Sequence, residues 1–414
     1  MPSTTNNILL LLLLVPVGVI AQSNNLTGSP YSLFGLGVQS NSNLGGFNAF
    51  GKTGIAYGEG FVVNPYNPAA VSNVPEKTFL FDIGINTEIS AVSNRADDER
   101  RIASNFSNIA VGFNPSGKWG VGLTLTPATN VGYSLIGIQT NIEGSVENFT
   151  SNVLGSGGIN RMSLDYGRTL SDTFRAGLNV SYLFGNIEET ESVILEDDIL
   201  QIEEKNHYNG FQFGFGIQYD PIKNLSVGAI VDLPVSLKGS QDRNVVKTLD
   251  FNPTLVEDET GVAIDNFLLP LEYGFGVSST QLKGLTLNVD YTRKEWSNTN
   301  QRDNIGEYVD QDIIGMGMDY TPNRRGFTYW DRVSYRAGFQ YDSGYLKIND
   351  FNVSSYTLSA GIGLPFGKKG STFNISYSYG SQGQVEGILI EENTHLINLN
   401  LTLSDIWFLR RKIN

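Results

Sequence analysis

The feature that most constrains this chain is an alternation of apolar and polar residues that recurs along most of its length. In STFNISYSYG (371–380) every second residue from Phe373 onward is aromatic or aliphatic, and the residues between are Asn or Ser. Side chains of a strand point alternately to its two faces, so one face of such a strand is apolar and the other is polar. The same pattern occurs in TFLFDIGINTEI (78–89), FQFGFGIQY (211–219) and LINLNLTL (396–403). The chain is therefore predicted to be all-β.

About fourteen strands are expected, and the segments between them fall into two classes. The expected strands lie near 77–91, 104–114, 119–137, 159–168, 173–187, 206–220, 224–238, 265–279, 284–296, 310–321, 331–342, 352–366, 371–380 and 395–408. Short turns such as PSGK and GKKG alternate with longer loops along almost the whole chain, and TPNRRGFTYW is the one long turn among the short ones. Outer-membrane barrels have this asymmetry, with short periplasmic turns and long extracellular loops.

The polar faces of these strands carry charged groups, including Asp82, Arg175 and Asp290. The apolar face of each of these strands must nevertheless be buried. Water inside a barrel can solvate such groups, although an open soluble sheet could also expose them. Spanning backbone must be fully paired, and a closed even-numbered barrel achieves this. We therefore predict a closed antiparallel transmembrane β-barrel over residues 77–414, in the outer membrane of a Gram-negative bacterium. Tyr377 should face lipid and Ser376 the lumen.

The chain begins with an apolar run that is too short for a spanning helix, which needs roughly 20 residues. Val19 and Ala21 suit the −3 and −1 positions of a signal-peptidase site, so residues 1–21 are predicted to be a signal peptide. The absence of Lys or Arg before the run fits less well, and a membrane anchor is the alternative. At the other end, Trp407 and Phe408 finish the last expected strand, and barrel-insertion machinery commonly reads such terminal aromatics.

Residues 22–76 do not alternate, and they contain too many aromatic and aliphatic residues for a solvated tail. Asn67 followed by Pro68 is typical of a helix start, with Asn as the N-cap. A barrel of about fourteen strands has an interior that must be filled. The segment is therefore predicted to be an N-terminal plug, with Phe47, Phe50 and Phe61 as its apolar contacts. A disordered periplasmic leader is the alternative.

The run GKTGIAYGEGFVVNPYNPAA resembles the N-terminal signature of the FadL/TodX family of outer-membrane hydrocarbon transporters, with Asn67, Pro68 and Ala69 matching its Asn-Pro-Ala motif. SPYSLFGLG and the DIWFLRRKIN ending are similar to Bacteroidetes-type members. The resemblance implies that a hydrophobic molecule enters from the extracellular loops, that the plug moves, and that the molecule leaves sideways at a kinked third strand. Family relatives also include barrels that hold secreted proteins, such as the PorV-type component of a secretion system.

Pro127 lies in the middle of the expected third strand, WGVGLTLTPATNVGYSL. Proline cannot donate a hydrogen bond to a neighbouring strand, so it should bend the strand or interrupt its pairing. Pro127 is thus the candidate lateral gate, and a harmless bulge is an equal alternative.

Other chemistry is poorly represented in this sequence. The formal net charge of −14 disfavours nucleic acid, which needs clustered Lys and Arg. The chain has no Cys and only two histidines, His207 and His395, so no metal site, cofactor or catalytic set is expected and an enzyme is not predicted. The acidic stretch 188–205 could hold a cation or bridge to lipopolysaccharide, but it lacks the spacing of a calcium loop, and a solvated surface loop is the simpler reading.

These observations favour passive transport of hydrophobic small molecules, such as long-chain fatty acids or hydrocarbons, through a monomeric plugged barrel. The expected partners are the hydrophobic ligand, outer-membrane lipid and lipopolysaccharide, and the insertion machinery during biogenesis. The alternative is a barrel that binds protein partners in secretion. A general porin is a third possibility, against which the plug-like segment counts.

Overall fold

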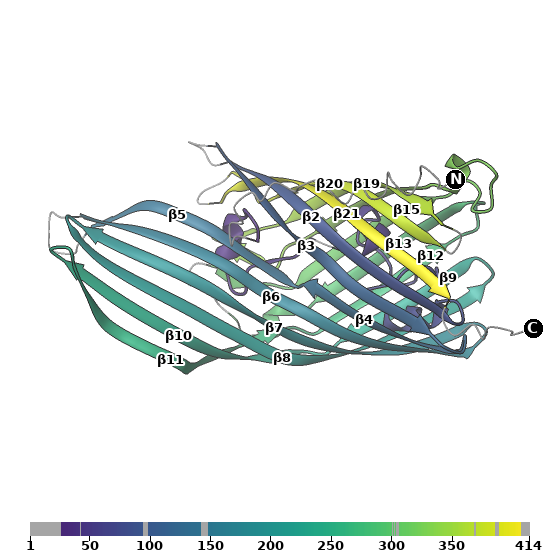
Figure 1. Cartoon of the computed structure of the whole chain (residues 1–414), viewed down its shortest axis with the longest axis horizontal. Coiled ribbons are helices and arrows are strands. Elements are labelled where there is room, and N and C mark those ends of the chain that lie inside the picture. Colours follow the sequence, from purple (N-terminus) through teal and green to yellow (C-terminus); the bar gives the residue numbers. More distant parts are fainter. Residues whose placement is uncertain are drawn as a thin grey trace, which may run out of the picture.

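The protein is described by a computed structural model in which a tilted β-barrel surrounds the N-terminal part of the chain (Figure 1). The structure describes residues 26–41, 43–93, 98–141, 148–299, 301, 303, 306–367, 370–385 and 389–406. The predicted signal peptide (1–21) and the aromatic pair Trp407 and Phe408 lie outside the described residues.

A ring of antiparallel strands closes where the first wall strand pairs with the last, from Thr78 opposite Ile406 to Ser93 opposite Glu391. Going round the ring, the strands are β2 (Thr78–Ser93), β3 (Asp98–Asn114), β4 (Trp119–Pro127), β6 (Asn148–Ser171), β7 (Phe174–Leu195), β8 (Asp198–Ile222), β9 (Leu225–Asp232), β12 (Glu272–Ser279), β13 (Leu285–Lys294), β15 (Gln311–Tyr320), β16 (Ser334–Asp342), β19 (Ser355–Phe366), β20 (Ser371–Gln382) and β21 (Glu391–Ile406). The predicted closed barrel of fourteen strands is confirmed.

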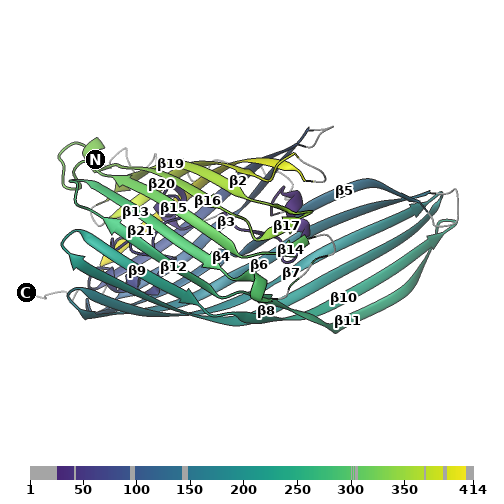
Figure 2. The ribbon, with the colours of Figure 1, turned by 180° about the vertical axis from the view of Figure 1, so that it is seen from behind.

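Six neighbouring strands continue past the ring and form a curved sheet, called here the sheet extension, that projects along the long axis (Figure 2). Its strands are β5 (Thr129–Asn141), the first halves of β6 and β8, the second half of β7, β10 (Val235–Leu249) and β11 (Asn252–Leu269). The acidic stretch 188–205 belongs to it, so the expectation of a loop there was wrong. Its residues form the ends of β7 and β8, paired from Glu188 opposite Lys205 to Leu195 opposite Asp198.

The alternation in sequence corresponds to the two faces of the wall. On β8, the aromatic and aliphatic residues from Phe211 to Tyr219 are 43–60% exposed on the outside, whereas Gln212 and Gln218 are 5% and 0% exposed on the inside. On β20, Tyr377 is 46% exposed and Ser376 is 4% exposed. An apolar exterior around a polar interior is the pattern of an outer-membrane barrel.

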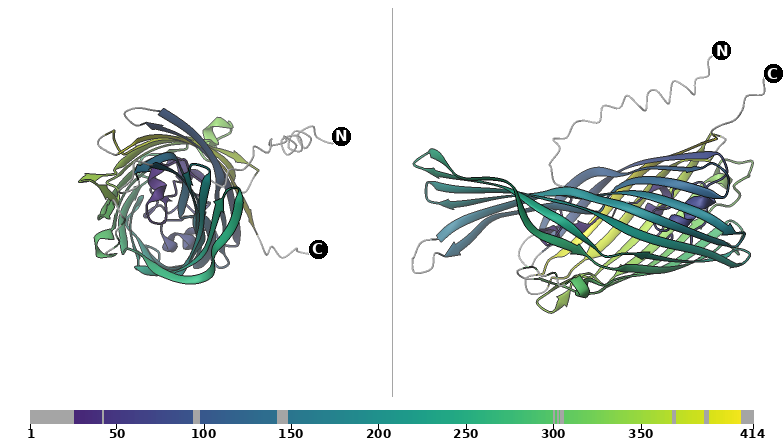
Figure 3. Two further views of the ribbon diagram at one scale, coloured as in Figure 1. Left: turned by 90° about the vertical axis from the view of Figure 1, so that its left-hand side faces the viewer. Right: turned by 90° about the horizontal axis from the view of Figure 1, so that it is seen from below.

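Residues 26–76 lie inside the ring, as the end-on view in Figure 3 shows. They form the 3-10 helices η1 (Pro30–Leu33), η2 (Gly45–Ala49) and η3 (Pro68–Asn73) and the two-residue strand β1 (Val38–Gln39). The remaining elements near the barrel mouth and turns are η4 (Trp296–Thr299), β14 (Gly306–Tyr308), η5 (Trp330–Arg332), β17 (Leu346–Ile348) and β18 (Phe351–Asn352). No helix in the described part of the chain is long and apolar enough to cross a membrane.

Candidate functional site

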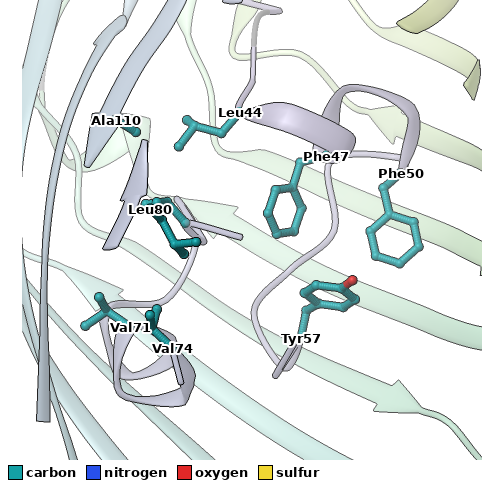
Figure 4. Packing of buried hydrophobic residues seen from close by; sticks show 9 residues of the cluster. Leu44, Phe47, Phe50, Tyr57, Val71, Val74, Leu80 and Ala110 are labelled. Carbon is teal, nitrogen blue, oxygen red and sulfur yellow. The ribbon is translucent and has the colours of Figure 1, made fainter. Parts of the chain in front are cut away.

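An aromatic cluster lies between the N-terminal segment and the wall (Figure 4). Phe47 and Phe50 are 3% and 2% exposed, and the ring of Tyr57 meets each of them edge-on at centroid distances of 5.5 and 5.4 Å. Leu80 of β2 completes the contact from the wall and is fully buried. Burial of one such aromatic side chain contributes about 1.5–3 kcal/mol, so the cluster ties the segment to the barrel.

The third residue predicted to act as an apolar contact lies elsewhere. Phe61 is 46% exposed, and its ring lies next to Gly370 in the turn that joins β19 to β20. Phe61 therefore sits at the end of the barrel that carries the short turns, outside the aromatic cluster.

Asn67 connects three parts of the molecule. Its Oδ1 accepts the Ala69 N–H at 3.0 Å, which caps η3. Its Nδ2 donates to the carbonyl oxygens of Ile55, at 2.8 Å, and of Ile217 in β8, at 3.0 Å. Pro68 occupies the first position of η3. An N–H at this position has no partner within the helix, so the absence of one in proline costs no hydrogen bond. The motif predicted from sequence thus sits where the N-terminal segment meets the wall.

Glycines in the wall allow this close approach. A Cβ on Gly177 of β7 would lie 2.4 Å from the Ala69 nitrogen, and one on Gly216 of β8 would lie 2.1 Å from Asn67 Oδ1. No side chain fits at either position, so the backbone of η3 packs directly on the strands.

Polar groups of the wall bind the backbone and side chains of the segment. The Asp290 carboxylate accepts the N–H groups of Gly54 and Ile55 at 2.6 and 2.9 Å. Asn48 in η2 donates to Asn400 of β21 at 3.0 Å. Buried polar groups destabilise a fold unless they are hydrogen-bonded, and here the wall and the segment supply each other's partners.

A cavity of about 410 Å³ lies between the N-terminal segment and the wall. This volume is within the range of small-molecule sites. The apolar part of its lining includes Phe34, Leu36, Leu44, Ile55, Ile159, Leu183, Leu237, Phe267 and Trp296. The charged part consists of Lys52, Glu88, Arg161, Asp232, Glu272, Asp290, Lys294, Asp342 and Glu392. The cavity therefore offers a ligand both apolar surface and charged side chains that could bind a polar group.

The wall loses its pairing on one side of the cavity. β3 pairs with β4 only from Ile109 opposite Leu125 to Phe113 opposite Val121, whereas β3 pairs with β2 up to Asp98. β4 ends at Pro127, and within the described residues no ladder joins β3 to β5. We call this interval, between residues 98–108 of β3 and the facing edge of β5, the wall split.

The start of the described chain, residues 26–29, lies in the wall split and is called here the N-terminal strap. Thr27 donates to Glu88 Oε1 at 2.7 Å, and Ser29 donates to Glu392 Oε2 at 2.5 Å. Leu26 donates its N–H to the carbonyl oxygen of Val131 in β5 at 3.4 Å.

Arg101 of β3 also crosses the wall split. Its guanidinium donates to the carbonyl oxygens of Gly28 in the strap and Ser134 in β5, at 3.4 and 3.3 Å. The strap and Arg101 thus occupy the place of the missing strand pairing.

Pro127 lines the cavity at the end of β4, next to the wall split. Sequence reasoning missed the strap, which carries no motif, and two further prolines in the wall. Pro234 separates β9 from β10, and Pro270 separates β11 from β12. Both could have been found by the argument applied to Pro127. Among the described residues no group of three or more His, Cys, Asp and Glu side chains could hold a metal ion.

Comparisons with known proteins agree with this architecture. The toluene transporter TodX of P. putida has a TM-score of 0.61 at 14% identity, covering 89% of this chain and 100% of that one. The toluene transporter TbuX of Ralstonia pickettii has a TM-score of 0.59 at 14% identity, covering 87% and 98%. A FadL homologue of Pseudomonas aeruginosa has a TM-score of 0.59 at 13% identity, covering 88% and 98%.

No curated protein sequence matches this one. At 13–14% identity the structural likenesses establish the fold, which is that of the FadL-type outer-membrane barrels. The family model described as BamG matches residues 4–414, nearly the whole chain. This outer-membrane barrel therefore belongs to the BamG family.

Proposed function

We propose that this protein carries hydrophobic small molecules across the outer membrane without an energy source. The observation that carries the proposal is that one cavity touches Pro127, the start of β5 and the strap residues Thr27 and Ser29, which lie in the wall split. A molecule held there can contact the apolar part of the lining, and the membrane lies beyond the strap. The toluene transporters TodX and TbuX, which share the fold, add support.

The proposed path has three stages. The molecule enters at the mouth beneath the sheet extension, where Leu36, Tyr133 and Leu237 form an apolar wall. It then occupies the cavity, where burial of apolar surface contributes about 25 cal/mol per Å². It leaves between β3 and β5 when the strap moves, because among the described residues the strap, Arg101 and other side chains, rather than a strand ladder, fill that interval. Long-chain fatty acids and monoaromatic hydrocarbons are the two substrate classes we propose.

The test uses a pair of cysteines in a chain that has none. Arg101→Cys and Ser134→Cys place thiols on the two sides of the wall split, and a cleavable bifunctional reagent links them. Proteoliposomes are assayed for uptake of toluene and of a long-chain fatty acid. We expect uptake to fall at least tenfold on linking and to return on cleavage, with each single-cysteine variant as control. Uptake that continues through the linked split would refute the lateral exit, and no uptake by any form would refute transport.

The alternative, a protein-binding barrel of a secretion system, predicts a different composition of the purified protein. Native mass spectrometry of protein extracted gently from its own membrane should show a small hydrophobic mass in the cavity. A stoichiometric protein partner with no small ligand would favour the alternative.

A further inference from the structure

The sheet extension has a charge distribution unlike that of the rest of the chain. Residues 185–209 and 235–269, which form two of its three hairpins, hold 14 Asp or Glu residues against four Lys or Arg, a net charge of −10 out of −14 for the chain. The described residues of the neighbouring hairpin, 129–141 and 148–160, hold no charged residue at all. The negative charge is thus gathered on β7, β8, β10 and β11.

Exposed apolar side chains lie among these carboxylates at the free corner of the sheet. This tip patch consists of Ile199, Leu249, Phe251, Leu255 and Val256, which are 40%, 41%, 84%, 57% and 60% exposed. The register places Ile199 and Leu255 on one face, because Thr248 pairs with Ile199 and Val246 pairs with Leu255. Leu249, Phe251 and Val256 lie beside them in sequence at the end of the same hairpin. A compact group of exposed apolar side chains rimmed by polar residues typically marks an interaction surface.

Lipid is a poor occupant for this patch. β8 begins at Asp198, and its pairing with β9 starts only 16 residues later, where Gly214 lies opposite Asp232. At ~3.3 Å per residue this is roughly 50 Å along the strand, well past the apolar belt of the wall. Short turns and the end of β21 lie at the opposite end of the barrel (Figure 1), so the extension projects outside the cell. The anionic surface of an outer membrane would also repel its carboxylates.

A second copy of the chain is also disfavoured. The outer edge of β11 is unpaired among the described residues, but two copies joined there would oppose Glu257, Asp258 and Glu259 to their own equivalents. Like charges placed opposite each other on paired strands are destabilising. β11 also carries Pro253 and three bulges opposite β10, which are the usual protections of an edge against strand addition. The occupant should therefore contact side chains rather than extend the sheet.

We infer that the tip patch is the docking surface for an extracellular protein that presents apolar side chains surrounded by Lys and Arg. The apolar contact supplies affinity, and the field of the ten excess negative charges selects and steers a basic partner. This inference does not depend on the transport function, because the patch lies far from the cavity and the wall split.

Its test is site-specific photocrosslinking in intact cells, with a photoreactive amino acid in place of Val256. We expect one protein adduct of defined mass, identified by mass spectrometry, with a basic surface at the crosslinked peptide. Leu255→Ser and the double variant Asp258→Lys/Glu259→Lys should each reduce its yield at least tenfold. Neither carboxylate makes an ion pair with another described residue, so the double variant should leave the fold intact, as heat-modifiable migration on gels can verify.

The matched controls lie at the other end of the barrel. A photoreactive residue at Phe327, which is fully exposed in the β15–β16 turn, should not form the adduct, and Asp172→Lys should not change its yield from position 256. The inference fails if position 256 yields only lipid, lipopolysaccharide or a second copy, if it yields no adduct, or if the adduct survives charge reversal undiminished. Uptake of toluene, measured in the same variants, separates this outcome from any failure of the transport proposal.

Discussion

Replacement of Asn67 tests how the N-terminal segment is held in the barrel. Asn67→Ala removes the cap of η3 and both hydrogen bonds from Nδ2, to Ile55 and Ile217. The barrel wall should persist, because its ladders do not involve this side chain. The loss should therefore appear as easier local opening of residues 26–76 rather than as unfolding of the whole protein.

The magnitude follows from the three bonds. Loss of an N-cap costs about 1 kcal/mol, and each buried acceptor left without a donor costs about 1 kcal/mol or more. The Ile55 oxygen also accepts from Gln218 at 3.1 Å, so it remains partly satisfied. The total is about 2–3 kcal/mol, which corresponds to a roughly 30- to 140-fold increase in the population of the opened segment.

Hydrogen exchange followed by mass spectrometry measures this population directly, and Asn67→Asp identifies the bonds responsible. Asp is as good an N-cap as Asn, so a role limited to capping predicts nearly normal exchange. In the structure, however, the Nδ2 position faces two carbonyl oxygens, and a buried carboxylate there would be repelled by both. We expect Asn67→Asp to be at least as damaging as Asn67→Ala. Wild-type protection in the Asp variant would refute the bridging role.

Three further predictions test the segment, the wall orientation and the split. Phe47→Ala should destabilise the N-terminal segment by about 3–5 kcal/mol and Phe61→Ala by less than about 1 kcal/mol, because only the first is buried; limited proteolysis of the segment would compare them. A cysteine at Tyr377 should react with a lipid-soluble thiol probe and one at Ser376 should not; the reverse labelling would overturn the proposed faces. Pro127→Ala restores a backbone donor beside the split, so liposome uptake should decrease, and unchanged or faster uptake would contradict a gating role.

The barrel wall could be predicted because its sequence pattern arises from neighbouring residues within each strand. Each spanning strand must show lipid-facing and lumen-facing residues in turn, and the printed sequence does so on β8 and β20 with few exceptions. The alternation of short and long connections placed the strands in a barrel. Asn67 with Pro68 likewise predicted a helix start from two adjacent residues, and η3 begins there.

The sheet extension was not predictable by the same argument. Beyond the membrane both faces of a strand meet water, so the two-residue alternation has no cause, and 188–205 reads as a solvated acidic loop. Its strands form because β7 and β8 continue a register already set inside the barrel, from Phe174 opposite Tyr219 to the tip. Likewise the strap, residues 26–29, is defined by contacts with β2, β5 and β21 that lie far away in sequence.

The prolines connect the wall split with the extension. Both free edges of the extension begin at a proline: β5 follows Pro127, and β11 ends just before Pro270. On the barrel side of each proline the strand has a partner on both flanks, β3 and β6 for β4, and β9 and β13 for β12. On the far side it keeps only one main ladder, with β6 for β5 and with β10 for β11, and the proline itself has no N–H to donate to a ladder. A proline therefore marks both the end of β4 beside the wall split and the end of the free edge of β11. The wall split and the free edges of the sheet extension thus share one sequence feature, a proline at the point where one flank of the strand loses its partner.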